Sequence, residues 1–204
     1  MEQTRRALVG AVISALGLTS EPAGAEAREL PAFVVYLSDQ APTEPRVLEQ
    51  ARSQADRIFN DAGVRVLWRD VKESVYNPGC DGFSVLVTLL SPAMVRQLSL
   101  QGMSERALGS AARAAGRAFI HPGRIHDFAS NTRSDAGHLM GRVMAHEIGH
   151  LLLPAGHSHY GIMSAGMDTD PSVAARFTVQ QARAIRGLVE TETATFVRRA
   201  DCGR

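Results

Sequence analysis

The sequence predicts a single α/β domain, built on a mixed, twisted sheet of about four strands with a long helix and a C-terminal helix. Strand patterns alternate with a helical pattern in the first half, and helix and loop dominate the second half. The chain has 204 residues, of which 45% are apolar and 21% charged, which is ordinary for a soluble domain with a substantial core. No repeat, linker or low-complexity tract divides residues 28–204.

Four strands are predicted, and two of them enclose the first helix. The run at 32–37 is rich in β-branched and aromatic residues, which favours a strand. Apolar residues then recur at helical spacing over 46–62, and Gly63 ends this helix before alternating residues at 64–68. The nearly continuous apolar run at 83–90 is typical of a central strand buried on both faces.

The middle of the chain has weaker patterns. A short helix is expected at 93–100, after Ser91-Pro92 breaks the preceding run. Residues 102–116 are rich in Ala, Gly and Ser, and we expect a loop there. The run at 117–120 predicts an edge strand, and 123–132 is expected to be a polar connection.

Two helices complete the prediction. One runs from a cap at Ser134 or Asp135 to about Leu152, with apolar residues on its core side, and ends before Pro154. The other starts at Thr178, where Thr178-Val179-Gln180-Gln181 forms a capping-box pattern, and continues to about Glu190.

The N-terminus has the layout of a secretory signal peptide. Two arginines precede an apolar run at 7–18, and A-x-A patterns end at Ala25 and Ala27. We therefore expect residues 1–27 to be removed and the protein to be secreted or periplasmic. The run is short for a bilayer span, so we expect no stable membrane insertion after cleavage; an uncleaved anchor or a buried helix is the alternative. A net charge of +1 and no basic patch with aromatic residues give no support to a nucleic-acid partner.

His146, Glu147 and His150 form an H-E-x-x-H pattern on the long helix. The spacing of four places both imidazoles on one helix face, where they can bind one zinc ion. Glu147 lies near the same metal and can take a proton from a zinc-bound water. The chemistry predicted by this pattern is therefore zinc-dependent hydrolysis.

A catalytic zinc needs a third protein ligand and an open fourth position. The chain turns at Pro154-Ala155-Gly156 and then presents His157, our preferred third ligand. His159, Asp168 and Asp170 remain alternatives.

Here the chain resembles the metzincin clan of zinc endopeptidases, whose pattern is H-E-x-x-H-x-x-G-x-x-H followed by a methionine-containing turn. His146 to His150, a third His followed by Ser158, and Gly161-Ile162-Met163 match that pattern. The chain is also similar to bacterial secreted proteins with H-E-x-G-H-L-L-L followed by H-S-x-x-G-I-M. Two features depart: Leu153 replaces the family glycine, and the third His comes seven residues after His150 instead of six.

The resemblance in motif covers about residues 134–163. It implies that the single domain expected at 28–204 is zincin-like, binds Zn²⁺ and cleaves a peptide or protein substrate as an endopeptidase. We expect the protein to be a monomer. Met163 would form the apolar floor of the site. The family tyrosine two residues after this methionine is absent, since Ala165 stands there, and Tyr160 is a candidate oxyanion stabiliser. The alternative function is a zinc-binding or peptide-binding module without turnover.

Cys80 and Cys202 are the two cysteines of the chain. In an exported protein we expect them to form a disulfide, because the compartment is oxidising. The alternative is that the Cys80 thiolate caps the zinc in a latent form.

Overall fold

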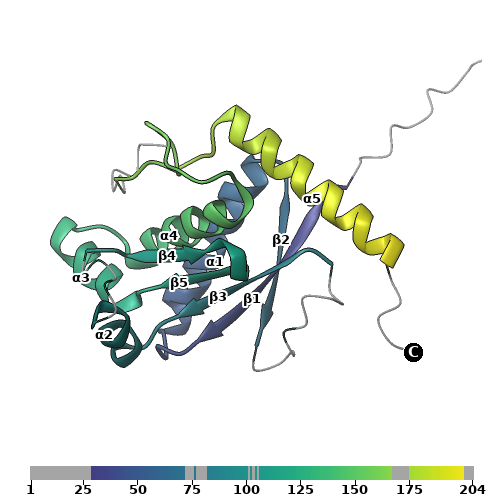
Figure 1. Ribbon diagram of the computed structural model, residues 1–204. Helices are drawn as coiled ribbons and strands as arrows, with labels where there is room; N and C mark the ends of the chain where they lie inside the picture. The colour runs from purple at the N-terminus through teal and green to yellow at the C-terminus, as the bar shows by residue number, and fades with distance from the viewer. Residues whose placement is uncertain are drawn as a thin grey trace, which may run out of the picture.

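A computed structural model of the protein describes residues 29–71, 76, 82–100, 102, 104, 106–166 and 175–199. The predicted signal peptide at 1–27, the pairing of Cys80 with Cys202 and the alternative ligands Asp168 and Asp170 lie outside these residues. The described part of the chain begins shortly before the first strand and ends at the last residue of the C-terminal helix (Figure 1).

The described chain folds around a five-stranded mixed sheet. Its strands are β1 (Ala32–Asp39), β2 (Arg65–Asp70), β3 (Ser84–Leu89), β4 (Gly109–Ala112) and β5 (Arg117–Ile120). They lie in the order β2-β1-β3-β5-β4. Every neighbouring pair is parallel except β4 and β5, which are antiparallel. The predicted α/β class, the mixed sheet and the central position of the 83–90 strand are confirmed, with five strands where about four were expected.

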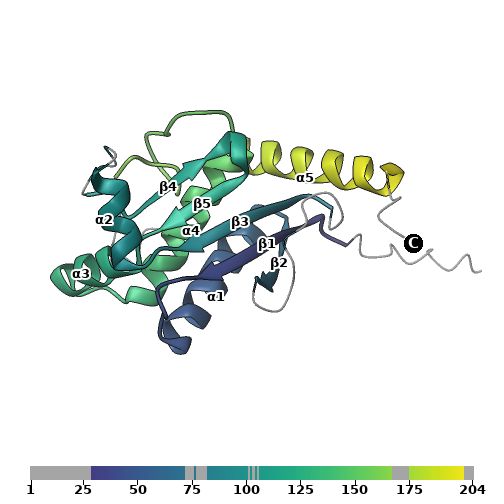
Figure 2. The same ribbon diagram turned by 60° about the horizontal axis from the view of Figure 1, so that its bottom comes forward.

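Helices cover the sheet and connect its strands. They are α1 (Pro45–Asp61), α2 (Pro92–Leu100), α3 (Pro122–Thr132), α4 (Ala136–Leu152) and α5 (Val179–Arg199), with a 3₁₀ turn, η1 (Arg113–Ala115). Figures 1 and 2 show α1 and α4 together against the sheet, and α5 packs near β1. In the part of the chain that is described, no helix combines the length and the apolar character needed to cross a bilayer.

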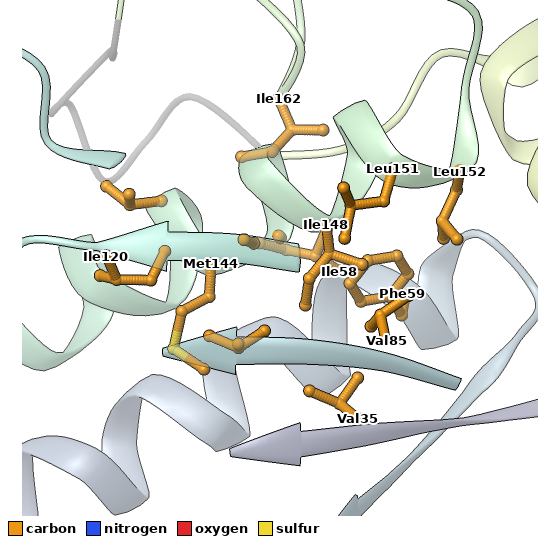
Figure 3. Packing of buried hydrophobic residues seen from close by; sticks show 14 of the residues in the cluster. Val35, Ile58, Phe59, Val85, Ile120, Met144, Ile148, Leu151, Leu152 and Ile162 are labelled. Carbon is orange, nitrogen blue, oxygen red and sulfur yellow. The ribbon is translucent and has the colours of Figure 1, made fainter. Parts of the chain in front are cut away.

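The hydrophobic core lies between the sheet and the α1–α4 pair. Phe33 of β1 meets Phe59 of α1 edge to face, with ring centroids 5.3 Å apart, and both side chains are fully buried. From α4, Met144 and Ile148 reach toward the sheet, where Val85 of β3 lies (Figure 3). An aromatic pair with the geometry of Phe33 and Phe59 stabilises the fold by about 0.5–1.5 kcal/mol beyond the gain from burying its apolar surface. This packing holds α4 in place along its whole length.

Two predictions for residues 102–120 were wrong. The expected loop contains β4 and η1, and β5 is not an edge strand, because β4 pairs with it on the outside. The Gly-Ser-Ala-Ala sequence of β4 has none of the β-branched or aromatic residues that mark strands. Its conformation comes from backbone pairing with β5, which a local pattern does not reveal.

The expected polar connection at 123–132 was also wrong, because α3 occupies it. Pro122 stands in the first turn, where a missing N–H costs nothing, and Ile125 and Ala129 form a buried stripe at helical spacing. The last helix starts as predicted, since Thr178 and Gln181 bond each other's backbone N–H groups at 2.9 and 3.2 Å. It continues past the expected end at Glu190 to Arg199.

Glycines allow α1 and α4 to approach closely. A Cβ added at Gly141 would lie 2.4 Å from the Ala51 carbonyl oxygen, and one at Gly137 would lie 2.6 Å from the Gln50 Cβ. Real Cβ atoms do not come this close to a backbone oxygen, so the helix separation requires glycine at 141. The two glycines are four residues apart and therefore share one face of α4.

We expect Gly141→Ala to lower the free energy of unfolding by about 1–2 kcal/mol. The added Cβ would meet a backbone oxygen, so the cost of overpacking lies in the upper part of its usual range, at about 2–3 kcal/mol, and alanine returns roughly 1 kcal/mol in helix propensity. Gly187→Ala on α5 is the matched control, because a Cβ there meets nothing within 4 Å, and it should raise stability instead. Urea unfolding of both variants measures the difference, and an equal effect of the two would contradict close packing at Gly141.

Candidate metal centre

The long helix α4 carries three of the predicted site residues. Its start is fixed by Asp135, whose side chain accepts a hydrogen bond from the His138 N–H at 2.8 Å, so the predicted cap is confirmed for Asp135. The helix ends at Leu152, and Leu153 is extended, with φ −106° and ψ 160°. This extended residue precedes Pro154, which disfavours the helical conformation for the residue before it.

The chain then turns back under the end of α4. Gly156 has φ 118°, a backbone conformation that favours glycine. Within the returning segment the Ser158 N–H donates to the Met163 carbonyl at 2.8 Å. The extended Leu153 and the turn at Gly156 together bring the chain back toward α4 at His157.

Three imidazoles meet where the returning segment passes α4. The Nε2 atoms of His146 and His150 are 3.0 Å apart, and one ring nitrogen from each of His146, His150 and His157 lies within 4.8 Å of the other two. The His157 ring centroid is 5.3 Å from that of His146 and 4.8 Å from that of His150. The structure therefore brings these three predicted residues together.

The spacing and the environment of the histidines fit a zinc ion. Two tetrahedral ligands at about 2.0–2.1 Å from zinc are about 3.3 Å apart, close to the 3.0 Å between the His146 and His150 Nε2 atoms. The His146 Nδ1 is 2.7 Å from the Ile162 carbonyl oxygen, which can only accept. Nδ1 therefore carries the proton and Nε2 the free lone pair, the arrangement typical of histidine ligands.

Burial keeps the two helix histidines neutral. Burial lowers the pKa of His146, and the hydrogen bond to Ile162 only partly offsets it. Burial and the neighbouring His146 and His157 lower the pKa of His150 to about 4. Neutral imidazoles are the form that binds metal, so at pH 7 no proton has to leave His150 first. His157 is exposed, which leaves one side of the cluster open to solvent.

Glu147 is buried beside the histidines. Its side chain is 7% exposed, and burial raises its pKa to about 7. Gly109 of β4 packs directly against it, because a Cβ at that position would lie 2.8 Å from the carboxylate Oε1. A carboxyl group with a pKa near neutral can both take and return a proton, although a cation bound nearby would lower that pKa.

A pocket of about 310 Å³ opens beside these groups. Glu147, His146 and His157 line it, and its other lining residues come from the segment before β4 and the first residue of β4, from α3 and α4, and from the chain after Met163. They are Arg106, Ala107, Leu108, Gly109, Phe128, Val143, Ser164 and Ala165. A ligand in this pocket would contact the buried carboxyl group and the histidine cluster together.

Met163 and the alternative residues occupy different places. Met163 is 1% exposed and packs under α4, where a Cβ at Gly149 would lie 2.4 Å from the methionine Sδ. Tyr160 is 72% exposed and lines another pocket, with residues 176–180. His159 is exposed and lies outside the three-histidine cluster. Asp168 and Asp170 fall outside the described residues.

Two glycines that sequence reasoning missed shape the site. Gly149 lets Met163 approach the helix between the two histidines, and Gly109 lets β4 approach Glu147. Glycine inside a helix lowers helix stability by about 1 kcal/mol relative to alanine. A glycine between Glu147 and His150 therefore indicates, from the sequence alone, that another segment packs closely against the helix there. Gly109 offered none, because β4 itself was not predicted.

Comparison with known proteins yields only distant structural similarity. No protein-family model matches the sequence, and no curated protein matches it. Among solved structures, archaemetzincin from Archaeoglobus fulgidus aligns with 18% identity over 74% of this chain and 99% of its own, at a TM-score of 0.44. A zinc-dependent peptidase from Methanocorpusculum labreanum aligns with 11% identity over 79% of this chain and 99% of its own, at a TM-score of 0.40. Archaemetzincin from Methanopyrus kandleri aligns with 12% identity over 83% of this chain and 98% of its own, at a TM-score of 0.47.

Proposed function

We propose that this protein is a zinc-dependent peptidase in which His146, His150 and His157 hold the metal and Glu147 is the general base. The observation that carries the proposal is the separation of roles within one small volume. Three ring nitrogens lie within 4.8 Å of one another, while the buried carboxyl group of Glu147 stands outside that set. A site that only bound zinc would have no use for a buried carboxyl group that is not a ligand, given the cost of burying it.

Bound zinc would supply a Lewis acid that activates a water molecule and polarises the carbonyl of the scissile bond. Glu147 takes the proton of the water that attacks this carbonyl and returns it to the amine that leaves. Hydrolysis therefore yields one carboxyl and one amino terminus. Burial of Glu147 favours this exchange, because it raises the pKa of the carboxyl group above its usual value in water.

The outer edge of β4 offers a platform for an extended peptide. Gly109 and Ala111 pair with Ile120 and Ala118, while Leu108 accepts from the His121 N–H. Because hydrogen-bonded pairs alternate along an antiparallel ladder, Gly109 and Ala111 direct their backbone groups away from β5. A peptide added to this edge would run past Gly109, which touches Glu147. This geometry supports a peptide substrate.

We also propose that the protein is exported and acts as a monomer. The basic and apolar residues at 1–18, followed by A-x-A patterns, support export. A non-catalytic zinc-binding or peptide-binding module is the alternative, and it differs from the enzyme in a single respect, namely turnover. Both would bind zinc through the same histidines.

Metal removal tests the proposal directly. The purified protein should contain about one zinc ion per chain and cleave an unstructured protein such as reduced, alkylated casein. Dialysis against a strong chelator should abolish cleavage, and adding back zinc should restore it, because the activated water depends on the ion. Magnesium, which prefers oxygen ligands, is the matched control and should not restore it. A protein that binds zinc and cleaves no substrate would be the binding module.

A further inference from the structure

His121 is a fully buried histidine that the proposed reaction does not use. It follows β5 directly and stands at the start of α3. Its backbone N–H donates to the Leu108 carbonyl at 2.9 Å, and its Nδ1 is 2.7 Å from the Ala107 carbonyl oxygen. One residue thus holds two consecutive carbonyls of the segment that leads into β4.

Arg124, one turn further along α3, binds the same segment. Its Nη1 donates to the Ala107 carbonyl at 3.0 Å and to the Ser104 carbonyl at 2.8 Å. Its Nη2 donates to the Ser99 Oγ at 2.8 Å, at the end of α2. His121 and Arg124 therefore together hold the backbone carbonyls of Ser104, Ala107 and Leu108, an arrangement that we call the His–Arg clasp.

The held segment is a wall of the candidate active site. Residues 106–109 line the pocket that contains Glu147, and Gly109 touches the Glu147 carboxyl group. We propose that the His–Arg clasp positions this wall for catalysis, so that His121 and Arg124 are positioning residues. This inference rests on the proposed peptidase function, because it assigns the clasp to substrate placement along β4 and beside Glu147.

The hydrogen bonding of His121 favours this role over ordinary core packing. The Ala107 carbonyl can only accept, so Nδ1 carries the proton, and Nε2 is then an acceptor. Nε2 is buried and has no hydrogen-bond partner among the described residues. Burial, together with the charge of Arg124, lowers the pKa of His121 and keeps the ring neutral. A leucine would fill this position without an unpaired polar atom, so what histidine adds is the bond to Ala107.

The test compares His121→Leu with His121→Asn. Leucine removes the donor, whereas the asparagine Nδ2 occupies the place of the histidine Nδ1 and can still donate to Ala107. We expect His121→Leu to lower kcat/KM by about 10- to 100-fold with zinc content unchanged, because small misplacements of this kind have such effects. His121→Asn should recover most of the loss. Arg124→Met and Arg124→Lys form a second pair on a partly exposed residue. If His121→Leu does not fold, a loss of kcat/KM in Arg124→Met that Arg124→Lys partly recovers tests the same inference.

Hydrogen exchange provides a readout that is independent of activity. His121→Leu should speed amide exchange in residues 106–111 and leave exchange in α1 unchanged, and His121→Asn should not. If wild type cleaves no peptide, the proposed function fails, and exchange alone then decides whether the clasp holds the segment. The inference would be overturned if His121→Leu and His121→Asn lowered kcat/KM and speeded exchange equally. It would also be overturned if exchange and kcat/KM were unchanged in both His121→Leu and Arg124→Met.

Discussion

Replacing Glu147 by glutamine should lower kcat/KM by about 10²–10⁴-fold while the protein keeps its zinc. The amide has nearly the same shape as the carboxyl group, so the contact with Gly109 survives. It cannot take a proton from water, and general acid–base groups typically contribute a factor of this size. The three histidines are untouched, so the metal content should match wild type. Peptide hydrolysis and elemental analysis on the same preparation measure both quantities.

Glu192→Gln is the matched control for this variant. Glu192 is an exposed carboxylate on α5, so the same chemical change there should leave kcat/KM within experimental error. Loss of zinc from Glu147→Gln would mean that Glu147 holds the metal. Activity above half of the wild-type value would remove Glu147 as the general base and would favour a different proton acceptor.

Replacing His157 by alanine should weaken zinc binding by more than about 100-fold. Loss of a residue that only hydrogen-bonds to a metal ligand costs about 10- to 100-fold in affinity, and loss of a ligand itself should cost more. Its ring lies 4.8 Å from His150 and 5.3 Å from His146, centroid to centroid, so its removal leaves only two of the three ring nitrogens. Two ligands do not satisfy a catalytic zinc site. Activity should fall in parallel with zinc content and recover in part at high zinc concentration.

His159→Ala is the control that the chain itself provides. His159 lies two residues away, is also exposed, and stands outside the cluster. This variant should keep both zinc and activity. If His157→Ala retained its zinc, the third ligand would be another residue, and Asp168 and Asp170 would then be replaced in turn. Loss of zinc from His159→Ala alone would exchange the roles of the two histidines.

Local patterns were sufficient for much of the fold and for the candidate metal ligands. The helical spacing at 46–62 and the apolar run at 83–90 produced α1 and β3, because each element buries a face whose periodicity appears in the sequence. His146 and His150 share a face for the same reason. The meeting of these residues with His157 could be expected once Pro154 ended the helix and Gly156 allowed a turn.

Elements that owe their form to distant partners were missed or misplaced. β4 is a strand only because β5 pairs with it, and the sequence predicts an edge strand at 117–120 because no local pattern indicates β4. The contact between Gly109 and Glu147 joins residues almost forty positions apart, and no local pattern encodes it. Tyr160 is a candidate by proximity in sequence, and its side chain is exposed and lines another pocket, so its role as oxyanion stabiliser stays a prediction.

The α/β class, the long helix with its two histidines and glutamate, and the turn before His157 can all be predicted from the order of the amino acids. They follow from periodicity, capping and spacing within short segments. The enclosure of the site could not be predicted in this way: β4 lies against Glu147, Met163 lies beneath Gly149, and His121 and Arg124 hold the wall of the pocket. Enclosure depends on contacts between segments far apart in the chain, and such contacts form only when the whole core packs.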